Sequence, residues 1–369
     1  MISDKLKDYA PTMDEDYRPR LTDCCNGLLL LVDNCVVNPA TRQWARFPPC
    51  PRSPTKGMDG FSYWVDYMFL MFDPTVSPHY RVLAMPYLPY RKDYKQQREA
   101  AEGIEWPPSP CIVQVFSSTV GQWEERELVR EGEAVCTAAD LLEGLDQYHD
   151  GVYWREAMYV HCTKNFLMRI ALSESKYQVI KTPVGVDVVR HTVDLRIGKS
   201  NNSVYCASVS EYRLRIWLLR DSGGKMDWML MHHTNLYALT TNDLWMRDRY
   251  GPNKIMNGPW VWTCYDHWRE RPEKMEWDSD DDNVIEGIDE MEQDSCHRNI
   301  DTLILGFHPF KQVVFLHVNS DHEVAYHWNS CKVQYMGGHS YVHYFPVPPD
   351  VQSSFVYTPC WERDLPNGN

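Results

Sequence analysis

IVQVFSSTVGQWEERELV, residues 112–129, is a short apolar strand that turns tightly into a second strand opening on Trp123. Four other stretches repeat the pattern and place Trp44, Tyr177, Trp228 or Tyr335 where this one has Trp123. They read CVVNPATRQWARF (35–47), FLMRIALSESKYQVIKTP (166–183), LRIWLLRDSGGKMDWMLMH (214–232) and EVAYHWNSCKVQYMG (323–337).

The spacing of the five aromatic residues indicates one blade per repeat. They are separated by 79, 54, 51 and 107 residues. A four-stranded propeller blade takes roughly 40 to 50 residues, so the two shorter gaps fit one blade each. The two longer gaps contain insertions. Residues 87–110 carry charges and four prolines, which is the composition of a loop, and 237–300 are rich in tryptophan and acidic residues. We therefore expect an all-β fold, a closed β-propeller of five to six four-stranded blades, with residues 237–300 leaving room for the sixth.

The ends of the chain suggest how the ring closes. Blade one reads as lacking one inner strand, because the apolar run CCNGLLLL (24–31) is interpreted as a single strand. The stretch SYVHYF (340–345) has no partner in its own repeat, so a C-terminal strand completing the first blade would close the ring and remove exposed sheet edges. We expect a polar lead-in over 1–23, one propeller domain over 24–361 and a tail over 362–369.

Charge argues against nucleic acid as a direct ligand. The net charge is −14, and ten acidic residues with no Lys or Arg lie in 276–294, so the remainder carries only −4. No basic stripe suited to a phosphate backbone is present in the sequence. The default for such an acidic run is a solvated loop, and the alternative is a docking surface for a basic partner.

The twelve cysteines do not indicate a disulfide framework, because the sequence offers neither the apolar core of a signal peptide nor a stretch long enough to span a membrane. We expect an intracellular, cytoplasmic or nuclear monomer with reduced thiols and no membrane association. The neighbours Cys24 and Cys25 should point to opposite faces of a strand, as buried structural thiols rather than a redox pair.

The same blocks resemble the large grass (cereal) family of F-box proteins, in the F-box-associated, kelch-like β-propeller region at their C-terminal end. The resemblance spans almost the whole chain in the order of the family. It rests on CCNGLLLL (24–31), VVNPATRQWARFPP (36–49), FDPTVSPHYRVLAMP (72–86), VQVFSSTVGQWEERE (113–127), GVYWREAMYV (151–160), SVYCASVSEYRLRIWLL (203–219), LGFHPFKQVVFLH (305–317) and YTPCW (357–361).

In that family the propeller-like region captures a target protein, and a separate F-box docks on the Skp adaptor of a cullin ubiquitin ligase. Residues 1–23 do not resemble the Leu-Pro-rich helical segment that opens an F-box. The resemblance therefore implies a target-binding propeller without its F-box, uncoupled from the ligase and not expected to bind the Skp adaptor or cullin.

The residue patterns of the sequence give little support for a catalytic site or a metal-binding site. The sequence holds no Gly-x-Ser-x-Gly elbow, phosphate-binding Gly-rich loop or His-Glu-x-x-His. Six of the fourteen histidines fall between His308 and His343, but their spacing does not match a zinc site, so strand positions and turn caps are the plainer reading. The acidic run lacks the sixth-position glycine and terminal glutamate of an EF-hand. We expect no catalytic, cofactor-binding or metal-binding residues.

Trp260, Trp262 and Trp268 lie in the second insertion, outside the repeat, and are the candidate partner-binding residues, since tryptophan is enriched at binding hot spots. They could equally cap one end of the propeller. Of the strand-opening aromatics, Trp44, Trp123 and Trp228 are interpreted as blade-packing residues, because they hold one place in the repeat. Two alternatives to a binding module stay open: an enzyme with its active site in the central channel of the propeller, and a non-functional truncated fragment.

Overall fold

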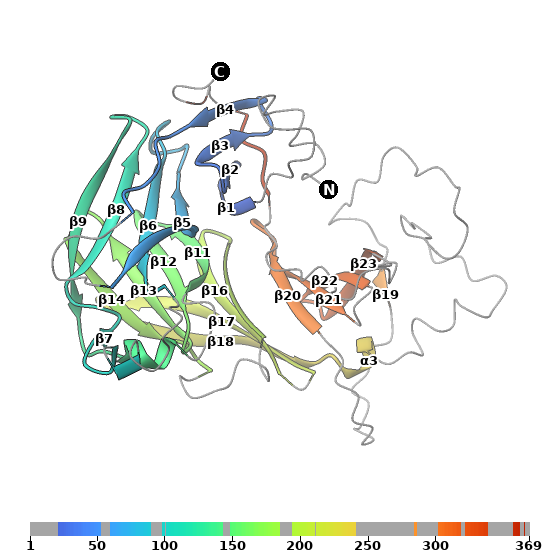
Figure 1. Ribbon diagram of the computed structural model, residues 1–369. Coiled ribbons are helices and arrows are strands. Elements are labelled where there is room, and N and C mark those ends of the chain that lie inside the picture. The colour runs from blue at the N-terminus through green and yellow to red at the C-terminus, as the bar shows by residue number, and fades with distance from the viewer. Residues whose placement is uncertain are drawn as a thin grey trace, which may run out of the picture. The chain divides into compact units, whose positions relative to one another are not determined.

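The computed structural model describes residues 21–52, 60–89, 98–99, 101–142, 148–184, 194–210, 212–240, 284–285, 302–318, 322–338, 357–361 and 365. These residues form mainly β-strands joined by tight turns (Figure 1). A 3-10 helix, η1, spans Ala138–Leu141 and a short α-helix, α3, spans Tyr237–Thr240. The chain divides into two compact units, residues 1–187 with 355–369, and residues 188–354. No helix of the described part is long and apolar enough to cross a membrane.

The described strands form five four-stranded antiparallel meanders, which we call blades 1 to 5. All five predicted hairpins are confirmed, and each strand-opening aromatic residue lies in the fourth strand of its blade. The strands are β1 (Leu21–Cys25), β2 (Leu28–Leu31), β3 (Cys35–Asn38) and β4 (Gln43–Arg46) in blade 1; β5 (Ser62–Met71), β6 (Arg81–Tyr87), β8 (Cys111–Ser117) and β9 (Gln122–Glu131) in blade 2; β11 (Tyr148–Trp154), β12 (Ala157–Cys162), β13 (Phe166–Ala171) and β14 (Lys176–Lys181) in blade 3; β15 (Asp194–Ser200), β16 (Ser203–Ser210), β17 (Arg213–Ser222) and β18 (Lys225–Asn235) in blade 4; and β20 (Thr302–Phe307), β21 (Val313–Val318), β22 (His322–His327) and β23 (Lys332–Gly338) in blade 5.

Blade 1 has four strands of its own, so the prediction that it lacks an inner strand is wrong. The run 24–31 is not one strand, because Asn26 and Gly27 take φ angles of 45° and 91° and turn β1 into β2. Asn-Gly is the strongest short signal for such a two-residue turn, since both positions need a positive φ. Strand β1 also begins at Leu21, inside the predicted lead-in. The predicted closing strand, 340–345, lies outside the described residues.

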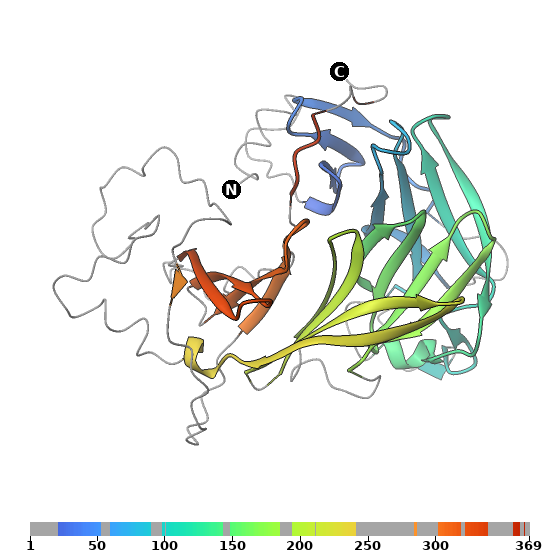
Figure 2. The same ribbon diagram turned by 180° about the vertical axis from the view of Figure 1, so that it is seen from behind.

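The C-terminal segment 357–361 nevertheless returns to blade 1 within the same unit (Figure 2). The side-chain amide of Asn38 donates a hydrogen bond to the carbonyl oxygen of Cys360 at 3.1 Å. A Cβ atom at Gly27 would lie only 2.5 Å from Cβ of Cys360, so this turn needs glycine for its space as well as for its φ. The backbone N–H of Leu365 donates to the side-chain oxygen of Gln43 at 2.5 Å.

Blades 2 and 3 join through their outer strands into one eight-stranded sheet. Strands β9 and β14 pair in parallel, with Val129 opposite Lys176 and Glu131 opposite Gln178. The side-chain amide of Gln178 donates to Glu131 at 2.8 Å and so reinforces the pairing. Each of these outer strands thus covers an edge that would otherwise stay open to another chain.

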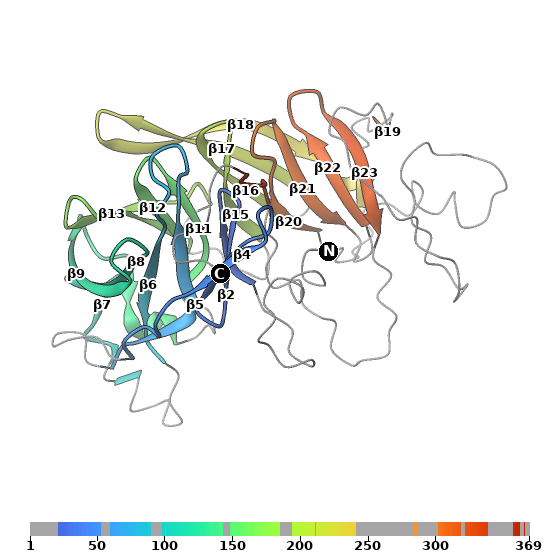
Figure 3. The same cartoon turned by 90° about the horizontal axis from the view of Figure 1, so that it is seen from above.

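Blades 4 and 5 belong to the second unit (Figure 3). They share one buried cluster that includes Leu214 and Ile216 from β17 and Val314, Leu316 and Val324 from blade 5. A fifth strand, β19 (Val284–Ile285), pairs antiparallel with β23. These two residues belong to the acidic run 276–294, so the solvated-loop prediction is wrong for them. The rest of that run lies outside the described residues.

Candidate partner-binding surface

An exposed aromatic residue lies at the start of a bulge in the first strand of blade 2. Strands β5 and β6 pair at Tyr63 opposite Pro86, and the pairing resumes at Met68 opposite Ala84. Residues 64–67 of β5 therefore stand opposite Met85 alone. Bulges redirect side chains and are common next to functional sites. Trp64 is 51% exposed, whereas the other tryptophans on the described strands are buried or half-buried.

Trp64 forms an aromatic surface with Tyr67 and Tyr87, which we call the aromatic ledge. The rings of Trp64 and Tyr87 meet edge to face with centroids 6.4 Å apart, and those of Tyr67 and Tyr87 lie 5.5 Å apart. Both tyrosines are half-buried, and burial raises the pKa of Tyr87. Tryptophan and tyrosine are the side chains that most often anchor protein interfaces, because they offer large contact area and few rotatable bonds.

Buried aromatic residues support the ledge from behind. The ring of Tyr67 packs edge to face on that of Tyr148 at 5.3 Å, and Tyr148 lies 5.8 Å from Trp106. The hydroxyl of Tyr148 donates a hydrogen bond to the carbonyl oxygen of Pro86 at 2.7 Å, next to Tyr87. Because each such ring pair adds about 0.5–1.5 kcal/mol beyond its burial, the ledge rests on a rigid base.

Trp106 belongs to the first predicted insertion, 87–110, which is not a plain loop. Trp106 is fully buried and stacks on Phe61 with centroids 6.1 Å apart. Strand β7 (Glu105–Trp106) pairs antiparallel with β10 (Cys136–Thr137). The interpretation of 87–110 as loop composition is therefore wrong for this part, which contributes a core side chain to the unit.

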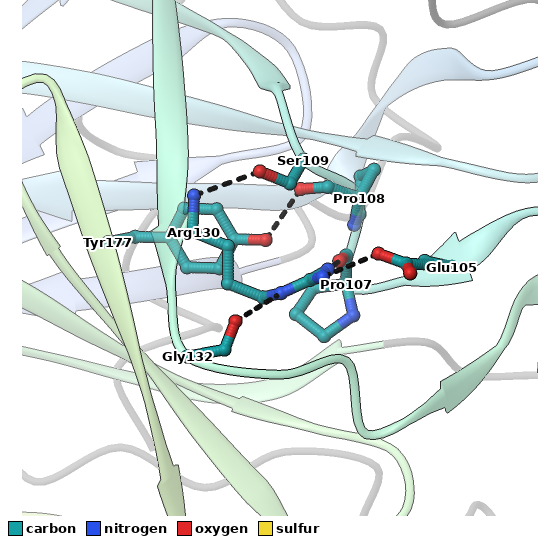
Figure 4. Close-up of polar contacts among 7 residues, drawn as sticks. All are labelled: Glu105, Pro107, Pro108, Ser109, Arg130, Gly132 and Tyr177. Carbon is teal, nitrogen blue, oxygen red and sulfur yellow. Dashed lines mark hydrogen bonds and ion pairs between the residues drawn. The ribbon is translucent and has the colours of Figure 1, made fainter.

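Arg130 of β9 holds the segment around Trp106 in place (Figure 4). Its guanidinium forms an ion pair with Glu105 at 2.5 Å and donates hydrogen bonds to the carbonyl oxygens of Pro107 and Gly132, the latter at 3.2 Å. The arginine side chain is only 7% exposed. Burial by itself would lower the pKa of Arg130, but the hydrogen bond and charge of Glu105 outweigh burial and raise it. The buried guanidinium is thus paired with a carboxylate and hydrogen-bonded through each of its three nitrogen atoms.

Tyr177, one of the strand-opening aromatics, completes this anchor. Its hydroxyl donates to the carbonyl oxygen of Pro108 at 2.5 Å, and the hydroxyl of Ser109 accepts from the backbone N–H of Arg130 at 3.1 Å (Figure 4). Trp123 holds the same place in blade 2, and its indole N–H donates to the carbonyl oxygen of Pro48 at 2.7 Å. The prediction that Trp123 serves blade packing is confirmed, because its ring also packs against Phe47 and Phe116.

The first strands of the blades carry aspartates that bear on the enzyme alternative. Asp23 in β1 is 4% exposed, and burial raises its pKa to about 7, with the charge of Asp150 adding to the rise. Both of its oxygens are engaged, by the backbone N–H groups of Cys24 at 2.8 Å and Leu70 at 2.6 Å. Asp194 in β15 similarly accepts from the backbone N–H of Ile304 at 2.5 Å. Because the same contact occurs in two places, these aspartates are better explained as links between the first strands of neighbouring blades than as catalytic acids.

The other chemistry-bearing residues take structural places. Cys24 packs with Leu29 and Leu31 while Cys25 joins a different cluster, so the predicted opposite faces are confirmed, and burial raises the pKa of Cys24. His308 caps a turn, its Nδ1 accepting from the backbone N–H of Lys311 at 3.1 Å. Within the described ranges, no three His, Cys, Asp or Glu side chains are placed to hold a metal ion.

The sequence-predicted contact residues Trp260, Trp262 and Trp268 lie outside the described residues. Sequence reasoning missed the aromatic ledge, because the largely apolar run WVDYMFLM (64–71) resembles an ordinary buried strand. The available signal was the aspartate at position 66, which interrupts the apolar run between Trp64 and Tyr67.

Comparison with known proteins supports the architecture. Residues 111–248 match the family described as F-box protein AT5G49610-like, beta-propeller. This span holds the outer hairpin of blade 2 and all of blades 3 and 4. The resemblance to F-box-associated propellers is therefore confirmed for these residues. No curated protein matches the chain.

Among solved structures, the chain is similar to KlHsv2 with loop 6CD replaced by a Gly-Ser linker, at 11% identity and a TM-score of 0.29, covering 61% of this chain and 62% of that one. It is also similar to Hsv2 of Kluyvelomyces marxianus, at 13% identity and a TM-score of 0.28, covering 61% and 75%. The chain thus spans less than two thirds of the first of these structures.

Proposed function

We propose that this chain is a non-catalytic protein-binding β-propeller that captures a target protein on the aromatic ledge. The observation that carries the proposal is the half-exposed Trp64 on a bulged first strand, backed by Tyr67, Tyr87 and the buried Tyr148. An indole held on a rigid aromatic base buries much surface against a partner at low entropic cost. The family match over 111–248 supports the same role, since it joins this chain to the propellers of F-box proteins.

The proposal extends to the architecture. We infer that the blades close into one propeller domain over 24–361, of five or six blades, with 237–300 as its main insertion. The four-stranded meanders of blades 1 to 5 and the propeller family match support this inference. In blade 1 the C-terminal segment contributes side contacts at Asn38 and Gln43, while β1 to β4 supply the four strands.

For the ubiquitin ligase, we propose only the target-binding part of the role. We expect the residues of this sequence to bind the target but not the Skp adaptor or cullin, because 1–23 do not resemble the opening helix of an F-box. We also expect a monomer in the cytoplasm or nucleus. Adding purified Skp adaptor to the isolated chain tests the first point, and co-elution of the two on gel filtration would contradict it.

Affinity capture from plant extract tests target binding. The wild-type chain, Trp64→Ala and Trp361→Ala serve as baits, and the recovered proteins are quantified by mass spectrometry. Trp361 is the matched control, since its side chain is 72% exposed on the C-terminal segment. We expect a set of proteins recovered by the wild type and by Trp361→Ala but lost with Trp64→Ala. Recovery of the same set by all three baits would contradict the proposal.

A further inference from the structure

The outer edge of blade 5 is occupied by a strand that comes from outside the four-stranded repeat. Strand β19 pairs antiparallel with β23, with Val284 opposite Gln334 and Ile285 opposite Val333 (Figure 1). Strand β23 is held in the sheet by its antiparallel pairing with β22 along its other edge, and the side chain of Val333 is fully buried. The edge of β23 therefore already accepts an added strand in this structure.

The pairing covers only two residues, which makes it weak. A backbone hydrogen bond contributes about 0.5–1.5 kcal/mol net, so a two-residue strand stays in place mainly because it belongs to the same chain. Tethering of this kind raises the local concentration of the strand to the millimolar range. A strand from another molecule that offers more contacts would displace it.

The pairing register of β19 and β23 indicates which peptide residues the edge of β23 favours. The occupant presents two adjacent aliphatic residues within SDDDNVIEGIDE (279–290). Continuing this register by one residue brings the position after the aliphatic pair of a bound peptide opposite Lys332, whose side chain is exposed. An acidic residue at that position would complement the lysine.

We propose that the outer edge of β23 is a strand-acceptor site for an extended acidic peptide with two adjacent aliphatic residues followed by an acidic one. The segment Val284–Ile285 occupies the site in cis and competes with that peptide. The backbone edge supplies the hydrogen bonds, and Lys332 selects the charge. The site lies in the second unit and does not rest on the aromatic ledge of the first.

Fluorescence anisotropy with the labelled peptide SDDDNVIEGIDE tests the proposal on the full chain. The double variant Val284→Pro/Ile285→Pro opens the edge, because proline cannot donate to the ladder. Asp289→Pro/Glu290→Pro is the matched control, since it places two prolines in the same insertion and keeps the aliphatic pair. Circular dichroism melting shows whether both variants remain folded.

We expect the peptide to bind the opened variant at least about tenfold more tightly than the wild type or the control variant. Adding Lys332→Glu to the opened variant should weaken binding about fivefold and favour the peptide SDDDNVIKGIDE instead. Equal affinity for all chains, no binding to a folded opened variant, or equal binding of the control peptide SDDDNSSEGIDE would overturn the proposal. Trp64→Ala should leave peptide affinity unchanged, so this test is separate from that of the proposed function.

Discussion

The carboxylate of Asp23 accepts a hydrogen bond from the backbone N–H of Leu70 at 2.6 Å, which ties the first strand of blade 1 to the first strand of blade 2. Asp194 and Ile304 repeat this contact between blades 4 and 5 at 2.5 Å. An aspartate on a first strand that accepts from the next first strand satisfies a backbone donor that no strand of its own blade reaches. This contact accounts for the buried Asp23 and the half-buried Asp194 without assigning them a catalytic role.

Stability should fall with rising pH because of Asp23. Burial raises its folded pKa to about 7, above the ordinary value of 3.8, so the folded state binds the proton more tightly than the unfolded state. The stabilising contribution is complete below about pH 4 and is lost as pH rises through about 7. Asp23→Asn cannot ionise, so its stability relative to wild type should increase from pH 4 to pH 8, by about 4 kcal/mol at most. Urea unfolding at both pH values measures the difference.

Asp140 provides a control of opposite sign. It closes a capping box at η1, accepting from the backbone N–H and the hydroxyl of Thr137 at 2.8 Å each, and these bonds lower its pKa. Its contribution is present above its ordinary pKa and disappears in acid. Asp140→Asn should therefore cost most at neutral pH and least near pH 3. If Asp23→Asn and Asp140→Asn showed the same pH trend, the assignment for Asp23 would be wrong.

Gly27→Ala should separate the C-terminal segment from blade 1. The substitution strains a residue at φ 91° and drives a Cβ atom to within 2.5 Å of Cβ of Cys360. We expect a loss of about 3 kcal/mol in unfolding free energy, the sum of the backbone strain and the overpacking. Gly121→Ala is the control, because Gly121 also has a positive φ, 74°, but a Cβ there meets nothing within 4 Å. It should lose only about 1 kcal/mol, and equal losses would contradict the contact with Cys360.

Arg130→Met should loosen the segment that carries Trp106. The change keeps the apolar stem but leaves Glu105 and two backbone carbonyls without their donor. We expect a loss of about 2–4 kcal/mol and faster hydrogen exchange confined to 104–110. Glu105→Gln removes the negative charge but keeps an acceptor oxygen for Arg130, and both backbone carbonyls keep their donor, so it should cost less than Arg130→Met. Hydrogen exchange with mass spectrometry is the measurement, and unchanged protection of 104–110 in Arg130→Met would contradict the anchoring role.

The sequence allowed the blades to be predicted because their signals are local. Alternation and turn residues define each hairpin within about 18 residues, and the hydrogen-bonded partners are close in the chain. The turn at Asn26–Gly27 has a local signal too, because Asn-Gly is a typical turn pair even though apolar residues flank it on both sides.

The candidate site could not be predicted in the same way. The bulge at Trp64 depends on which residue of β6 lies opposite, and the anchor joins Arg130 to residues more than twenty positions away. Asp23 and Leu70 are 47 positions apart. Such contacts arise from tertiary packing. A polar or aromatic residue within an apolar pattern therefore indicates a specific contact at that position, but it does not identify the partner residue.

The affinity of a captured target for three purified chains tests the central claim most directly. Once capture has supplied the target, isothermal titration calorimetry gives its Kd with the wild type, Trp64→Ala and Trp361→Ala. Removing a hot-spot tryptophan costs about 2 kcal/mol or more, so Trp64→Ala should raise the Kd at least about thirtyfold. Trp361→Ala should leave the Kd unchanged. Both variants should keep the melting temperature of the wild type. A Kd unaltered by Trp64→Ala but raised by replacing Trp260, Trp262 and Trp268 would contradict the ledge and place binding in the insertion.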